Sequence, residues 1–114
     1  MFEDVVVITG SKKLKEFVTD ILKNLNYNIV ASFINGQKAV RDCLELETDL
    51  IIIDIELKGS MDGYQVAREI YKKYKGPFIF LQNENNNISI HDDFMKVSTC
   101  LFKPFTTEEF KNHL

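Results

Sequence analysis

Several features are missing from this sequence, and each absence argues against a class of protein. No apolar run approaches the ~18 residues of a membrane span, and the chain starts with Glu3 and Asp4 rather than the basic residues of a signal peptide. The net charge of −3 and the pI near 5.4 give no basis for direct binding of nucleic acid. We therefore expect a cytoplasmic protein whose partners are neither nucleic acid nor membrane.

Cysteine is also scarce. Cys43 and Cys100 are the only two cysteines, and both stand in apolar surroundings without the spacing of metal ligands. Reduced and buried thiols are the expectation for such residues in a cytosolic protein.

The chain has no internal repeat and no linker, and its only low-complexity stretch is "NENNN" at 83–87. Its 114 residues, 45% hydrophobic and 27% charged, are typical of one globular domain with a single substantial core. We expect residues 1–114 to form one domain, either excised from a longer protein or standing alone.

Apolar, β-branched runs predict five strands. They cover residues 4–8, 27–33, 50–55, 78–82 and 99–102.

Helical patterns separate these runs. The first has one apolar face made of Leu14, Phe17, Val18, Ile21, Leu22 and Leu25; the second has Ala39, Val40, Cys43 and Leu44; the third has Val66, Ala67, Ile70 and Tyr74 and is stopped by Gly76-Pro77. A weak helix is predicted near 86–97. The last helix opens on Thr106 and Glu109, which match a capping box, and turns Phe110 and Leu114 inward.

This alternation predicts an α/β fold: a doubly wound, five-stranded parallel sheet with helices on both faces. Ligands of such sheets lie beyond the carboxyl ends of the strands. The stretch "LIIIDIELKGSMDG" at 50–63 is apolar until Asp54, so the strand presents a carboxylate at that end. Asp54 is the first candidate for a functional residue.

Three stretches resemble the receiver domain of two-component response regulators: "DLIIIDIELKGSMDGYQVAREI", "GPFIFLQ" and "CLFKPF". The family has an apolar strand ending in a phospho-accepting aspartate, a loop closing on Asp-Gly (here Asp62-Gly63), a Pro-led fourth strand, and Lys-Pro after the fifth. The resemblance spans essentially the whole chain. It implies the flavodoxin-like strand order 2-1-3-4-5.

By this resemblance, a partner histidine kinase or phosphotransfer protein would phosphorylate Asp54 to switch an output domain or partner protein. Lys103 would be the cation that pairs with the carboxylate and then with the phosphoryl oxygens. Pro104 would hold Lys103 in place, usually through a cis peptide bond. Mg²⁺ would bridge Asp54, the backbone carbonyl of Glu56 and acids at the end of the first strand.

The chain departs from the family at those acids. Thr9 and Gly10 stand where the family has two consecutive carboxylates. Asp4 cannot replace them, because it lies about 16 Å away along an extended strand. With so few carboxylates, binding of Mg²⁺ should be weak. The side chains of Glu56 and Glu84 are an open alternative source of negative charge.

Two further positions differ. Gln82 replaces the Ser or Thr whose hydroxyl donates to the phosphoryl group, and Cys100 replaces the Tyr or Phe that swings inward on activation. Both switch positions are therefore atypical.

Two functions remain open at this point. One is a receiver that accepts a phosphoryl group on Asp54, with at most self-phosphorylation and dephosphorylation as enzymatic activity. The other is a phosphorylation-independent pseudo-receiver that acts as a protein-interaction module, in which Asp54 and Lys103 persist as a structural ion pair. The surface of helix 86–97, the fifth strand and the last helix is the expected contact face for a partner or a homodimer. Asp54-Ile55-Glu56 also resembles the motif of haloacid-dehalogenase-like phosphatases, but that family has Asp as second acid, carries more chain and leads with this strand.

Overall fold

The five apolar runs form a single parallel sheet in the computed structural model, which describes residues 3–83 and 98–114. The strands are β1 (Asp4–Ile8), β2 (Asn28–Phe33), β3 (Leu50–Asp54), β4 (Phe78–Asn83) and β5 (Thr99–Lys103). Their spatial order is β2-β1-β3-β4-β5, with every neighbouring pair parallel. The predicted fold class and strand order are confirmed, and each strand matches its predicted range to within one residue.

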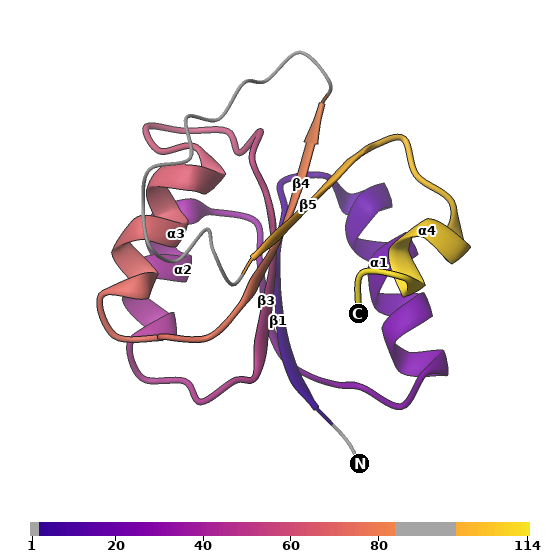
Figure 1. The fold of residues 1–114 in the computed structure, drawn as a ribbon. Helices are drawn as coiled ribbons and strands as arrows, with labels where there is room; N and C mark the ends of the chain where they lie inside the picture. The colour runs from indigo at the N-terminus through magenta and orange to yellow at the C-terminus, as the bar shows by residue number, and fades with distance from the viewer. Residues whose placement is uncertain (1–2, 84–97) are drawn as a thin grey trace.

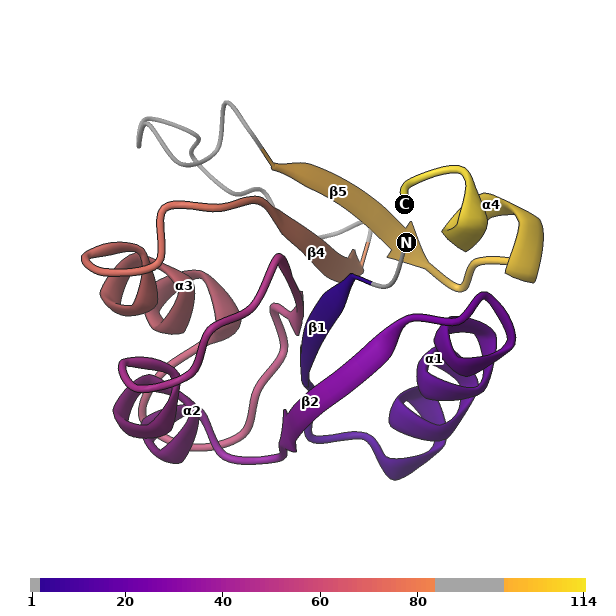
Figure 2. The same cartoon turned by 90° about the horizontal axis from the view of Figure 1, so that it is seen from below.

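Helices cover both faces of this sheet. They are α1 (Lys12–Asn24), α2 (Gly36–Cys43), α3 (Gly63–Tyr71) and α4 (Thr107–Lys111). Figure 1 shows the sheet edge-on, with α2 and α3 on one side and α1 and α4 on the other. Figure 2 shows β2 and β5 at the two edges.

Side chains of successive strand residues point to opposite faces, and this produces two cores. In β1, Val6 and Ile8 belong to the core under α2 and α3, whereas Val5 and Val7 belong to the core under α1 and α4. Every residue of β3 is buried because both faces of that central strand are covered.

Helix α1 is less deeply buried than its apolar face predicts. Ser11 caps it by accepting a hydrogen bond from the Leu14 amide. Val18 is fully buried, but Phe17 and Leu25 remain 38% and 39% exposed, at the rim of the core. The prediction that all six apolar residues face inward is therefore too broad.

Helix α3 is shorter than predicted. It ends at Tyr71, and Lys72 is its C-cap, so Tyr74 lies in the following turn instead of on the helix. The Tyr74 amide still donates to the carbonyl of Ile70 at 2.9 Å, and its hydroxyl donates to the carbonyl of Pro77 at 2.7 Å. Tyr74 thus stabilises the turn before β4 and does not extend the apolar face of α3.

The last helix agrees with its prediction at its start, but it ends at Lys111, so Leu114 packs against the core from beyond the helix. Thr106 and Glu109 form the capping box, and Phe110 is completely buried. The weak helix predicted near 86–97 and Glu84 lie outside the described residues. Within residues 3–83 and 98–114, no helix has the length and apolar character needed to cross a bilayer.

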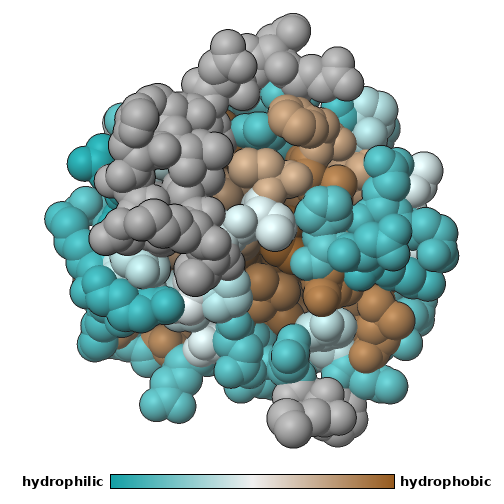
Figure 3. All heavy atoms as spheres, viewed as in Figure 1, coloured by the Kyte–Doolittle hydropathy of each residue, from teal (hydrophilic) through white to brown (hydrophobic). Residues whose placement is uncertain are grey.

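Apolar side chains also reach the surface. Figure 3, drawn from the side of Figure 1, shows them in the middle of this face, between polar side chains. Edge strand β5 contributes to the exposed apolar surface of the protein, because Phe102 is 47% exposed.

Candidate functional site

Three polar side chains lie at the carboxyl ends of β1, β3 and β5. They are Thr9, directly after β1, Asp54, the last residue of β3, and Lys103, the last residue of β5. Each comes two positions after a residue of the core under α1 and α4, namely Val7, Ile52 and Leu101. Because strand side chains alternate with period two, all three are directed to the same side of the sheet.

The Asp54 carboxylate accepts a hydrogen bond from each of these neighbours. The Lys103 ammonium donates to Oδ1 at 2.9 Å, and the Thr9 hydroxyl donates to Oδ2 at 3.0 Å. The backbone N–H of Glu56 donates to Oδ1 at 3.1 Å. Asp54 is only 2% exposed, so these donors replace the water that would otherwise solvate its charge.

The Glu56 side chain enters the same cluster. Its Oε2 atom accepts a hydrogen bond from the Lys103 ammonium, and its Oε1 atom accepts one from the backbone N–H of Asn83 at 2.9 Å. Glu56 therefore links the tip of β5 to the tip of β4. Lys103 lies between two carboxylates, those of Asp54 and Glu56.

The surroundings of Lys103 stabilise its charged form. Burial lowers the pKa of its ammonium, but the hydrogen bonds and charges of Glu56 and Asp54 outweigh burial, so the pKa lies above its ordinary value of 10.5. The peptide bond between Lys103 and Pro104 is cis, as the family resemblance implies.

The Asp62-Gly63 pair positions the carboxyl end of β3. Asp62 caps α3 through a capping box with Gln65, and the Gly63 amide donates to the carbonyl of Ile55 at 2.8 Å. A Cβ atom on Gly63 would lie 2.1 Å from the backbone oxygen of Asp54. Only glycine allows the start of α3 to pack this closely against the strand that carries Asp54.

Comparison with known proteins agrees with this geometry. The family model described as the response regulator receiver domain matches residues 5–114. The chain belongs to this family.

Solved receiver structures share the fold. The N-terminal domain of a response regulator/sensory box/GGDEF protein from Carboxydothermus hydrogenoformans is 24% identical, with a TM-score of 0.80 over 96% of this chain and 89% of that one. A chain in the CheX-CheY-BeF3-Mg complex from Borrelia burgdorferi is 20% identical, with a TM-score of 0.84 over 97% and 85%. The receiver domain of a sensor histidine kinase from Pseudomonas aeruginosa, solved with magnesium in its active-site cleft, is 23% identical, with a TM-score of 0.75 over 98% and 93%.

Thr9 and Gly10, which the sequence analysis expects at the positions of the two family carboxylates, directly follow β1. Thr9 is buried and its oxygen accepts a hydrogen bond from the Ser11 amide at 3.1 Å, while its hydrogen is directed to Asp54. Gly10 has no side chain to offer. Sequence reasoning treated both positions as losses, and it missed the hydroxyl that Thr9 supplies at the end of β1.

The oxygen atoms around Asp54 do not fit a tight magnesium site. Mg²⁺ prefers carboxylate and water oxygens in octahedral geometry. The carboxylates of Asp54 and Glu56 are both engaged by Lys103, and the neighbouring Thr9 oxygen is a neutral hydroxyl. In the described part of the chain, no three His, Cys, Asp or Glu residues are grouped as metal ligands.

Among the described residues, no hydrogen bond joins Gln82 or Cys100, the two expected switch positions, to Asp54 or Lys103. Gln82 is 5% exposed, and its Oε1 atom has no hydrogen-bond partner in the structure that residues 3–83 and 98–114 describe. Cys100 is a half-buried free thiol that packs against the core under α2 and α3, and burial raises its pKa. Cys43 is also free and is buried as expected, whereas Cys100 is less buried than expected.

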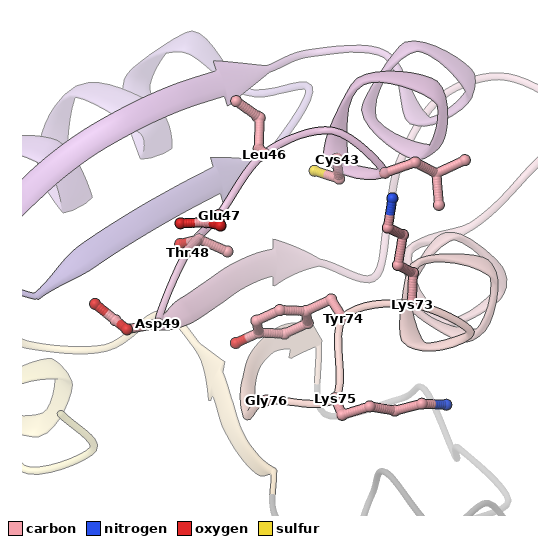
Figure 4. Close-up of a pocket in the computed structure, with 10 residues that line it drawn as sticks. Cys43, Leu46, Glu47, Thr48, Asp49, Lys73, Tyr74, Lys75 and Gly76 are labelled. Atoms are coloured by element: carbon pink, nitrogen blue, oxygen red, sulfur yellow. The ribbon is translucent and has the colours of Figure 1, made fainter.

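A separate hollow lies at the other end of the sheet, far along β3 from Asp54. It has a volume of about 460 Å³ and lies between the end of α2 and the turn before β4. Figure 4 shows Tyr74 extending between Cys43 and Asp49 in this hollow. Burial, then the charge of Asp49, raises the pKa of Tyr74, and burial with the charge of Asp42 raises that of Cys43 to about 11.

Proposed function

We propose that this receiver domain is a phosphorylation-independent module that signals through protein contacts. The observation that carries the proposal is that the buried Asp54 carboxylate accepts hydrogen bonds at both oxygens, from Thr9, Lys103 and the Glu56 amide. A carboxylate held by three donors on a nearly inaccessible side chain is a weak nucleophile, because attack on phosphorus requires breaking these hydrogen bonds. The cluster stabilises the ends of the strands.

The charges around Asp54 support the same proposal. Phosphoryl transfer depends on cations that neutralise the charge of the transferred group. Asp54 and Glu56 carry two negative charges against the single positive charge of Lys103. The net charge of this cluster repels a phosphodonor unless Mg²⁺ binds, and we infer that Mg²⁺ binds weakly here because Thr9 and Gly10 supply no carboxylate.

The contact surface that we propose is edge strand β5, on the face that Phe102 shares with Cys100. Phe102 is large, apolar and 47% exposed on an edge strand, which otherwise leaves backbone groups available for pairing. A partner protein or a second copy of the chain would cover this surface. The sequence analysis placed the partner contact on the fifth strand, the last helix and residues 86–97.

A second candidate is phosphotransfer from a histidine kinase or phosphotransfer protein to Asp54. The observation that favours it is the Lys103 ammonium, which lies 2.9 Å from Asp54 Oδ1 at the position where a phosphoryl group would need a cation. This candidate requires Thr9 and Glu56 to rearrange.

One experiment separates the two candidates. The protein is incubated with an acyl phosphate donor and Mg²⁺ or Mn²⁺, and its intact mass is measured. We expect no phosphoryl adduct in the wild-type protein. An adduct that disappears in Asp54→Asn would refute the proposal and establish the second candidate.

The contact surface has its own test. Substituting Phe102→Ser should abolish or weaken self-association or partner binding measured by sedimentation. Ile34 directly follows β2, the strand at the other edge of the sheet, and is 67% exposed, so Ile34→Ser is the matched control. Equal behaviour of the two variants would exclude β5 as the contact surface.

A further inference from the structure

The tips of β4 and β5 present two hydrogen-bond donors side by side. Asn83 and Lys103 are register partners in the pairing of these strands. The backbone N–H of Asn83 and the Lys103 ammonium both donate to the Glu56 side chain, each to a different oxygen. A backbone N–H beside an ammonium is a typical cradle for an anion.

Glu56 reaches this cradle from the loop after β3. Its own backbone N–H donates to Asp54, so the residue is held at both its amide and its carboxylate. The charged end of Glu56 thus lies beside Asp54, with Lys103 between the two carboxylates. A phosphoryl group on Asp54, or a free oxyanion beside it, would need the same two donors.

We propose that Glu56 is a built-in anion that fills the anion site formed by the Lys103 ammonium and the Asn83 N–H. The carboxylate excludes tetrahedral oxyanions from this site and holds the end of β4 in one arrangement without an added group. The inference rests on the proposed function, since a receiver whose anion site is filled by its own side chain needs no phosphoryl group there.

The charges at the site predict how removal of Glu56 would change the affinity for an anion. With Glu56 present, an entering dianion meets two carboxylates and one ammonium. Without Glu56, it meets one of each, and two donors are vacated. Removing the side chain should therefore open the site both by freeing hydrogen-bond donors and by removing a like charge.

The test is a titration with inorganic phosphate, followed by the ¹⁵N–¹H signal of Asn83. We expect Glu56→Ala to bind phosphate at least about tenfold more tightly than the wild-type protein, with a saturable shift at Asn83. The matched control is Glu45→Ala, which removes an exposed acid elsewhere and should behave as the wild type does. Adding Lys103→Met to Glu56→Ala should abolish the gain. Equal affinity in Glu56→Ala and wild type would overturn the proposal.

A second measurement begins with the wild-type protein and extends to two variants of Glu56. Hydrogen exchange of the Asn83 amide in the wild-type protein should be slow, because that N–H donates to Glu56. Glu56→Gln keeps an acceptor but loses the charge, so exchange at Asn83 should be intermediate between wild type and Glu56→Ala. Exchange of the wild-type amide at the rate of an unstructured peptide would refute the occupancy of the site by Glu56.

These outcomes are independent of the mass measurement on Asp54. A phosphoryl adduct would defeat the proposed function, yet phosphate binding and exchange at Asn83 would still report whether Glu56 occupies the cradle. Conversely, if Glu56→Ala bound phosphate no more tightly than the wild type, Glu56 would not explain why Asp54 stays unphosphorylated. That result would not be evidence for phosphotransfer to Asp54.

Discussion

Thr9 and Asp54, 45 positions apart in the sequence, are joined by a buried hydrogen bond of 3.0 Å from the Thr9 hydroxyl to Asp54 Oδ2. The bond crosses from the end of β1 to the end of the neighbouring strand β3. It directs a neutral donor to the carboxylate, at a position where the resemblance implies an acid. The relationship makes Thr9 a structural partner of Asp54 rather than an empty position.

Replacing Thr9 with valine tests this role. Thr9→Val keeps the shape of the side chain but removes the hydrogen bonds that the Thr9 hydroxyl makes with Asp54 Oδ2 and the Ser11 amide. We expect the free energy of unfolding to fall by about 2 kcal/mol in urea denaturation, because buried polar groups would lose hydrogen bonds. Thr99→Val, on an exposed position of β5, is the control and should change stability little. Equal losses of unfolding free energy in Thr9→Val and Thr99→Val would contradict this role of Thr9.

Gly63 should not tolerate even a methyl group. In Gly63→Ala the Cβ would lie 2.1 Å from the backbone oxygen of Asp54, so α3 or the end of β3 must move. We expect a loss of about 3 kcal/mol and shifted amide signals around Asp54. Gly10→Ala is the matched control, because its Cβ would have its nearest neighbour 3.9 Å away, the carbonyl oxygen of Ile34. A stable Gly63→Ala with an unshifted Asp54 would contradict the packing described for the α3 start.

Much of the fold follows from periodicity in the sequence. The apolar runs set the strands. The resemblance to receiver domains implied that Lys103 pairs with Asp54, and the two groups lie 2.9 Å apart. The helix ends were harder, because Tyr74 continues the pattern of α3 while its backbone already belongs to the turn. The apolar pattern reflects which side chains are buried. Because Tyr74 is partly buried, the pattern places it on the helix although its backbone lies in the turn.

The site itself was only partly predictable. Glu56 was expected to offer a backbone carbonyl to a metal, and that role remains a prediction; its carboxylate instead accepts from Lys103 and the Asn83 amide. Long side chains reach partners from other strands, and no local pattern encodes such contacts. One signal was available for Thr9, since it follows β1 with the same alternation that places Asp54 at the tip of β3.

Alkaline pH should destabilise the protein through Cys43. Burial and the charge of Asp42 raise the pKa of this thiol from 9.0 to about 11. Between these values the unfolded chain loses the thiol proton while the folded chain keeps it, so the free energy of unfolding falls as the pH rises. Urea denaturation at a series of pH values should show this fall, and Cys43→Ala should flatten the slope above pH 9.0 relative to wild type. An unchanged slope would mean that other groups, such as Tyr74, dominate.

Restoring the acids should create a metal-dependent protein. Thr9→Asp combined with Gly10→Asp places two carboxylates beside Asp54, and Gly10 has room for a Cβ. Without metal, repulsion among the acids should lower the melting temperature, and Mg²⁺ should raise it again with increasing concentration, because a ligand that binds only the folded state stabilises it. The wild-type protein should show no such rise beyond that of an equal ionic strength of NaCl, and Gly10→Asp alone should show a smaller one. A wild-type response equal to that of the double variant would mean that Asp54, Glu56 and Thr9 already hold Mg²⁺, against the donor chemistry of the site.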